Sequence, residues 1–284
     1  MKIQEMAALS DLPVLGAGMG YRDFYREDTF IAASHIDFLE ITADHFLGSS
    51  RAQQQQLDRL HSNFTLIPHG LNLSLGSAEG MNKPYFRQLQ NLVRKVNPPW
   101  WSEHISFTQA DGVEIGHLSP VPLNQSALDV LVENIRIAQN EIETPLILEN
   151  ITYSMQLPWN EIPEEEFLAE LLGRTGCGLL LDVTNLYINS KNHEYDPIKW
   201  LKKLPSDKVI QLHFVGCDLV NGELVDNHSQ ATNDGIWSLL ETVLEMFPVK
   251  GAILERDKNL PSIEKITEEL DRLREIGRSK NRWN

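Results

Sequence analysis

The amino-acid sequence predicts a single-domain (β/α)8 TIM barrel, and three observations support this fold class. Along the 284 residues, short apolar runs alternate with longer amphipathic stretches, and there are eight such runs. Several runs are continuously apolar, as expected of parallel strands that are buried on both faces. A chain of this length commonly forms one barrel, so we assign residues 1–284 to one α/β domain.

The eight apolar runs define the expected strands. They are residues 14–19, 36–42, 64–69, 101–107, 146–150, 178–183, 209–214 and 251–256. The stretches between them have apolar residues at helical spacing, which predicts amphipathic helices. The expected helices are residues 50–62, 83–96, 124–140, 163–174, 196–204, 235–246 and 262–276. In the fourth, Pro163 and the acidic residues after it suit a first turn, and Gly176 suits the stop.

A doubly wound open sheet is the alternative fold. It would normally show a Gly-rich phosphate-binding turn after an early strand. The segment Gly16-Ala17-Gly18-Met19-Gly20 is rich in glycine but lacks the GxGxxG spacing, so the barrel is favoured.

The composition excludes several classes of protein. The chain has 25 basic and 40 acidic residues, a net charge of −15, and no basic run that would suit a nucleic-acid groove. Two cysteines, Cys177 and Cys217, cannot make a disulfide scaffold or a CxxC zinc site. No apolar run approaches the roughly 20 residues that span a bilayer, and the first residues do not resemble a signal peptide. We therefore expect a cytoplasmic protein with no membrane or nucleic-acid partner.

Polar residues gather at the carboxyl ends of the expected strands. In a (β/α)8 barrel these ends and the loops after them form one rim, which carries the active site. We expect Asp226 and His228 to lie in the loop after the seventh strand. The rim set contains four imidazoles and four carboxylates: His69, His104, Glu149, Asp182, His213, Asp226, His228 and Glu255.

This set predicts a metal centre. A single His at a strand end is usually structural, but four carboxylates cannot share a low-dielectric pocket without protons or cations. Among these strand ends Lys is absent, and Arg256 is the only Arg. Eight N and O ligands exceed what one ion takes while keeping an open position, so we expect two or three ions. Iron, manganese and zinc all suit a ligand set without thiolates.

An ordered series of motifs, from about residue 16 to about residue 261, resembles the DUF692 proteins, also called UPF0276. These are described as multinuclear non-heme iron-dependent oxidases. The motifs that carry the resemblance are Phe38-Leu39-Glu40, His69-Gly70, Leu73-Ser74-Leu75-Gly76-Ser77, Ser102-Glu103-His104, Leu148-Glu149-Asn150, Leu180-Leu181-Asp182-Val183-Thr184-Asn185, Asn192-His193, Leu212-His213, Gly216, Asp226-Asn227-His228, Trp237 and Leu254-Glu255-Arg256-Asp257.

The resemblance implies a xylose isomerase-like barrel that holds two or three irons in mixed Fe(II) and Fe(III) states. The eight rim residues match the metal positions of the family, and Asn185 matches a further, more variable one. At such a centre we expect Asp182, His213 and Glu255 to serve catalysis. Known members modify cysteine in ribosomally made precursor peptides with O2, commonly with a partner protein that presents the peptide leader. Cys217 stands where the family usually has His.

Three other functions are compatible with these residues. The ligand pattern also resembles that of endonuclease IV, a three-zinc barrel that cleaves abasic DNA, although the acidity of this chain opposes duplex binding. A sugar isomerase or epimerase of the same fold class would need one or two divalent ions and no rim of four histidines. A metal-binding protein without enzymatic activity is the third.

Overall fold

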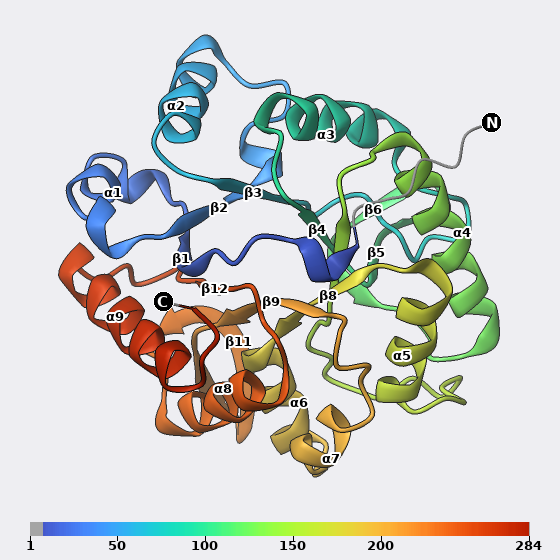
Figure 1. Cartoon of the computed structure of the whole chain (residues 1–284). Coiled ribbons are helices and arrows are strands. Elements are labelled where there is room, and N and C mark those ends of the chain that lie inside the picture. Colours follow the sequence, from blue (N-terminus) through green and yellow to red (C-terminus); the bar gives the residue numbers. More distant parts are fainter. Residues whose placement is uncertain (1–7, 284) are drawn as a thin grey trace.

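The structure, a computed structural model, describes residues 8–283 and confirms the barrel (Figure 1). Eight parallel strands close in the order β1-β12-β9-β8-β7-β4-β3-β2, so the open sheet is excluded. Each expected apolar run overlaps one of these strands. Their bounds are β1 Gly16–Gly20, β2 Phe38–Thr42, β3 Leu66–His69, β4 Trp101–His104, β7 Leu146–Glu149, β8 Gly178–Asp182, β9 Val209–Phe214 and β12 Gly251–Leu254.

Helices surround the barrel (Figure 1). Each of the seven expected helices is present: α2 Arg51–His61, α3 Lys83–Val96, α4 Gln125–Glu141, α5 Glu164–Thr175, α7 Pro197–Leu201, α8 Asp234–Met246 and α9 Ile263–Ser279. Gly176 ends α5 in the left-handed conformation with φ 74°, as expected of a C-terminal glycine. The expected helix at residues 196–204 is shorter, because α7 ends at Leu201.

Several short elements were not expected from the sequence. They are α1 Asp28–Ile31, α6 Val183–Asn192 and four 3₁₀ turns, η1 Leu9–Asp11, η2 Asp23–Tyr25, η3 Ala33–His35 and η4 Ala43–His45. Among them α6 matters most, because it begins at the end of β8 with Asp182 as its N-cap, and the Asp182 side chain accepts a hydrogen bond from the Asn185 backbone.

Two β-hairpins extend from the rim, one where we expected the end of the strand at residues 101–107 and the other where we expected a loop after the seventh strand. One pairs β5 Ser106–Ala110 with β6 Val113–Pro120, and the other pairs β10 Gly216–Val220 with β11 Glu223–Gln230. Their tips are Asp111-Gly112 and Asn221-Gly222, in which both residues have positive φ, as type I′ turns require. The expectation that Asp226 and His228 lie in a loop is therefore wrong, because both belong to β11.

The interior of the barrel is apolar in its lower part, toward the amino ends of the strands, and polar in its upper part, toward their carboxyl ends. Phe38, Ile67, Ile147, Leu180 and Ile253 form a buried cluster inside the barrel with Leu12, Trp100 and Ile210. Side chains along a strand alternate between faces, so residues two positions further on face the same interior, nearer the rim. These next residues are Glu40, His69, Glu149, Asp182 and Glu255. The polar centre therefore rests on an apolar floor.

Over the described part of the chain, no helix is both long and apolar enough to cross a membrane. The first seven residues, on which part of the signal-peptide expectation depends, lie outside the described residues.

Candidate metal centre

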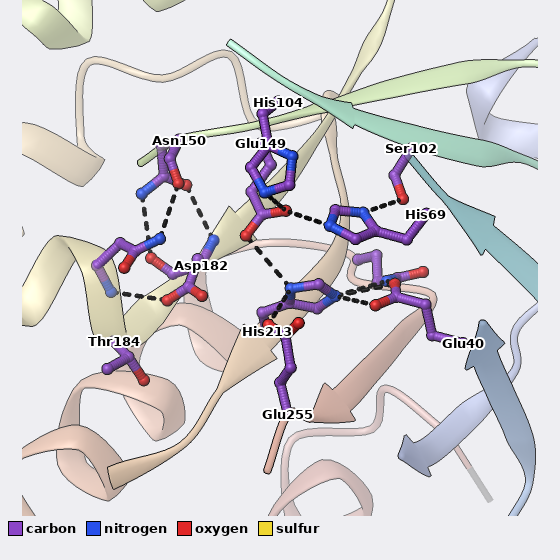
Figure 2. A network of polar contacts seen from close by, with 12 residues as sticks. Glu40, His69, Ser102, His104, Glu149, Asn150, Asp182, Thr184, His213 and Glu255 are labelled. Atoms are coloured by element: carbon purple, nitrogen blue, oxygen red, sulfur yellow. Dashed lines mark hydrogen bonds and ion pairs between the residues drawn. The ribbon is translucent and has the colours of Figure 1, made fainter. Parts of the chain in front are cut away.

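The structure brings six of the predicted residues together above the apolar floor (Figure 2): His69, His104, Glu149, Asp182, His213 and Glu255. Glu149 lies in their middle. Its Oε2 is 3.3 Å from Nε2 of both His69 and His104, and its Oε1 is 3.3 Å from Nδ1 of His213. All six side chains are buried except that of Glu255, which is 12% exposed.

Their ligand atoms form overlapping sets, each within 4.8 Å, that have the composition of metal sites. One set is His69, His104 and Glu149; a second is Glu149, Asp182, His213 and Glu255; a third is His228, Glu255 and Asp257; a fourth is Glu40, His69 and Glu255. The first two share Glu149, and the second and third share Glu255. A carboxylate has two oxygens, so a shared carboxylate can bridge neighbouring ions. The geometry therefore suits a centre of more than one ion.

The two remaining predicted ligands of the rim set, Asp226 and His228 of β11, lie at the edge of this centre. Nε2 of His228 is 2.9 Å from Oδ1 of Asp226, and its Nδ1 is 2.8 Å from Asp257 and 3.9 Å from Glu255. The register of the hairpin shifts between Asp218 and Gly216, and His228 has φ 53° within this irregular segment. Bulges of this kind re-aim side chains beside active sites. Here the bulge directs Asp226 and His228 toward the barrel residues.

Four buried atoms of the predicted ligands make no well-aligned hydrogen bond among residues 8–283, although three of them lie close to the ligand atoms of other rim residues. They are Glu149 Oε2, Asn185 Oδ1, His213 Nδ1 and Asp226 Oδ1. Leaving such an atom unpaired costs about 1–3 kcal/mol. Asn185 lies on α6, and its Nδ2 donates to the Asn150 carbonyl, which leaves Oδ1 free. These are the donor atoms that a metal ion takes, so the residues fit the predicted group.

Hydrogen bonds on the far side of each imidazole fix which nitrogen faces the centre. Nδ1 of His69 lies 2.8 Å from the Ser102 hydroxyl, and Nδ1 of His104 donates to the Gly70 carbonyl at 3.1 Å. This leaves Nε2 of both rings toward Glu149. For His213 the order is reversed, because its Nε2 donates to Glu40 at 2.8 Å and its Nδ1 faces Glu149 and Glu255. Such outer contacts orient metal-binding histidines.

Glu40 was missed as a site residue, although it belongs to a motif of the resemblance. It continues a buried chain of hydrogen bonds: Gln211 Nε2 donates to Glu40 at 2.6 Å, and Trp100 Nε1 donates to Gln211 at 2.7 Å. The signal was present in the sequence, since Glu40 follows Phe38 by two residues, as Glu149 follows Ile147. Asp257, in the third ligand set, was also missed.

The charges in the centre depend strongly on one another. Burial lowers the pKa of His104, but Glu149 and Glu103 outweigh it and raise the pKa to about 9. Burial, together with Glu149 and Asp226, raises the pKa of Asp182 well above its usual range. Against the effect of burial, His213 and His228 hold the pKa of Glu255 well below its usual range. Protons and cations thus compete for the same sites.

The charge compensation differs from the expectation in one respect. Arg256 points away from the centre, because its guanidinium donates to the Ser229 carbonyl and pairs with Glu269 at 3.2 Å. The rim cation is Arg22, which follows β1; it pairs with Asp257 and lies 3.7 Å from Glu255. One guanidinium does not offset the carboxylates of the centre, so the argument for metal ions still holds.

Neither cysteine belongs to the ligand sets found among the described residues. Cys177 is buried, and burial raises its pKa to about 12, which suits a core residue. Cys217 lies on β10 with its Sγ 3.7 Å from Asn233 Nδ2, and burial raises its pKa as well.

The fold places the chain in the class of xylose isomerase-like TIM barrels. It superposes on D-psicose 3-epimerase from Clostridium cellulolyticum H10 with a TM-score of 0.59 and 11% identity, covering 92% of this chain and 95% of that one. A D-tagatose 3-epimerase-like protein gives a TM-score of 0.57 and 17% identity over 93% and 98% of the two chains. At this identity the likeness shows the fold alone.

The chain belongs to the DUF692 or UPF0276 family. Residues 16–278 match the family model described as "RiPP precursor modification enzyme MbnB/TglH/ChrH". A UPF0276 protein of Caulobacter vibrioides is 34% identical over 260 residues, which cover 91% of this chain and 93% of the relative. A UPF0276 protein of Acinetobacter baylyi is 33% identical over 263 residues, 92% and 91% of the two chains.

Proposed function

We propose that the chain is a multinuclear non-heme iron-dependent oxidase that uses O2 to modify cysteine in a ribosomally made precursor peptide. The observation that carries this proposal is the pair of ligand sets that share Glu149, in a chain of a family of precursor-modifying enzymes. Carboxylate and imidazole ligands without thiolates suit non-heme iron, although zinc and manganese accept the same donors.

The residues proposed to hold two or three ions are His69, His104, Glu149, Asp182, Asn185, His213, Asp226, His228 and Glu255. When bound, iron supplies one-electron chemistry with O2 and lowers the pKa of a coordinated cysteine thiol. Asp182, His213 and Glu255 share one ligand set and are proposed to stand beside the reacting atoms. The apolar floor formed by Ile67, Ile147 and Leu180 closes the site from below and excludes water there.

The proposal includes partners and location. The substrate is a cysteine-containing precursor peptide, presented by a second protein that binds its leader, and the reaction takes place in the cytoplasm. Nucleic acid is not a substrate in this proposal, because the net charge of −15 repels a polyanion.

Metal analysis of protein purified without oxygen tests the proposal first, together with Mössbauer and EPR spectroscopy. We expect two or three irons per chain and a coupled signal from Fe(II) and Fe(III). A cysteine-containing peptide should perturb that signal and start O2 consumption, whereas the same peptide with serine should do neither. Zinc as the sole bound metal, in a protein that stays inert after iron is supplied, would shift the assignment to hydrolysis or epimerisation.

A further inference from the structure

A groove runs along the rim beside the metal centre, under the connection between β7 and α5 (residues 151–163). It consists of two hollows with empty volumes of about 490 and about 1140 Å³, and both are lined by Leu123, Tyr153, Asn160 and Glu164. The inner hollow reaches Asn150, the residue after Glu149. A molecule in this groove would therefore lie next to the proposed reaction site.

The two hollows differ in chemistry. Apolar side chains dominate the inner one, among them Ile105, Val121, Leu157 and Phe167. The outer hollow is lined by four carboxylates against one Lys, together with the aromatic residues Tyr195 and Trp200. The charged residues there are Glu161, Glu164, Glu165, Asp196 and Lys199. The inner hollow thus suits an aliphatic side chain, and the outer one suits a cation.

Buried side chains hold one of the acids that line the outer hollow. Trp200, which is only 4% exposed, directs its indole N–H at the Glu164 carboxylate, and Tyr195 lies against Tyr153. The Tyr153 hydroxyl donates to Glu164 at 3.4 Å, and burial raises the pKa of Glu164 to about 7.

The groove is preformed, because side-chain amides hold its connecting segment. Asn160 accepts from the Leu123 backbone at 2.9 Å, and Asn189 both accepts from the Tyr153 backbone and donates to the Ile151 carbonyl. On the same segment, the large apolar residues Met155 and Trp159 are each 64% exposed. Exposed apolar residues beside a polar rim are typical of a protein surface that binds a peptide.

We propose that this groove binds the substrate peptide next to the modified residue, with an aliphatic side chain in the inner hollow and a Lys or Arg in the outer one. This inference deepens the proposed function, on which it rests for the peptide nature of the substrate. The specificity it predicts is a basic residue beside an aliphatic one in the segment that enters the site.

Peptide binding to zinc-loaded protein tests the groove without turnover. The probes are short fluorescein-labelled peptides that lack cysteine and alternate Leu with Lys, Leu with Glu, or Ser with Lys, measured by fluorescence anisotropy. We expect the Leu–Lys peptide to bind about tenfold more tightly than either of the others. The double variant Glu161→Gln/Glu165→Gln should remove most of the preference for Lys over Glu, since it neutralises two of the four carboxylates that line the outer hollow.

The matched control is Glu133→Gln/Glu143→Gln, which makes the same change in net charge at exposed acids that do not line the groove. This variant should keep the preference. Equal binding of the three peptides, or an equal loss in both double variants, would overturn the groove proposal. Because the probes contain no cysteine, that outcome leaves iron content and O2 consumption as the separate test of the proposed function.

Discussion

The two sides of the metal centre hold their histidines differently. On the side of β3, β4 and β7, the closest outer partners of His69 and His104 are neutral, the Ser102 hydroxyl and the Gly70 carbonyl, and the Glu103 carboxylate lies further away, 3.5 Å from His104 Nδ1. On the side of β9, β11 and β12, His213 and His228 face the carboxylates Glu40 and Asp257. A carboxylate behind an imidazole makes it a stronger electron donor to a metal than a neutral partner does. The second side is therefore better suited to the more highly charged ion.

Exposure differs only at the hairpin. The side chains of His69, His104 and His213 are 3%, 7% and 0% exposed, and that of His228 is 17% exposed. Among these four histidines, the one on the β10–β11 hairpin is therefore the most accessible. Under the proposed function, His213 and Glu255 would help to hold the more oxidised iron, and His228 would lie at the more accessible edge of that site.

The largest expected effect is that of Glu149→Gln, because both sides share this carboxylate. Glutamine keeps the shape but loses the charge and one of the two acceptor oxygens. We expect the loss of most bound metal from both sets and a fall in activity of more than about a thousandfold, or roughly 4 kcal/mol. Metal analysis and O2 uptake measure these changes.

The control is Glu143→Gln, which lies before β7 and away from the rim. It should bind metal normally. Retention of full metal by Glu149→Gln would mean that the centre does not depend on a shared carboxylate.

The second prediction compares the outer partners of the two sides. Glu40→Gln should lower metal affinity by about ten- to a hundredfold, because mutation of such outer partners typically costs that much. Ser102→Ala should cost less, since it removes a neutral partner from His69. Competition with a chelator gives the affinities, and the Mössbauer parameters of the Fe(III) component should shift only in Glu40→Gln. Equal losses in the two variants would remove the proposed difference between the sides.

The smallest expected effect concerns pH. The fold raises the pKa of His104 from 6.5 to about 9. The protonated ring therefore stabilises the metal-free protein fully below pH 6.5, and this contribution is lost as the pH rises to about 9. Asp182, whose pKa is also raised, acts in the same direction.

Thermal denaturation measures this loss of stability. With a chelator present, Tm should fall by a few degrees between pH 6.5 and 9. Metal affinity should rise over the same pH range, because the ligands lose their protons. His104→Gln should flatten the fall in Tm, and the exposed His61→Gln should not. A Tm that rises with pH in the chelated protein would contradict this account.

The strand ends were predictable because parallel strands bring their carboxyl ends to one rim, so residues far apart in sequence, such as His69 and Glu255, could be placed together. Glu40 was missed because its carboxylate lies behind His213 and not among the expected ligands. Arg22 was missed because it follows a strand end by two residues. No periodicity predicts α6, since seven of its ten residues are buried and several have low helix propensity. Sequence pattern shows which strand end carries a group, but the local backbone decides where the group points.

The hairpin turn at Asn221-Gly222 contains none of the proposed metal ligands, yet it joins β10 to β11 and so sets their register. Gly222 has φ 90°, which side chains with a Cβ rarely adopt. A bulkier residue there would favour another turn length and shift the strand pairing, and with it the direction of the Asp226 and His228 side chains. Substitutions at this surface turn should therefore alter the proposed metal centre, although Gly222 itself contributes no ligand atom.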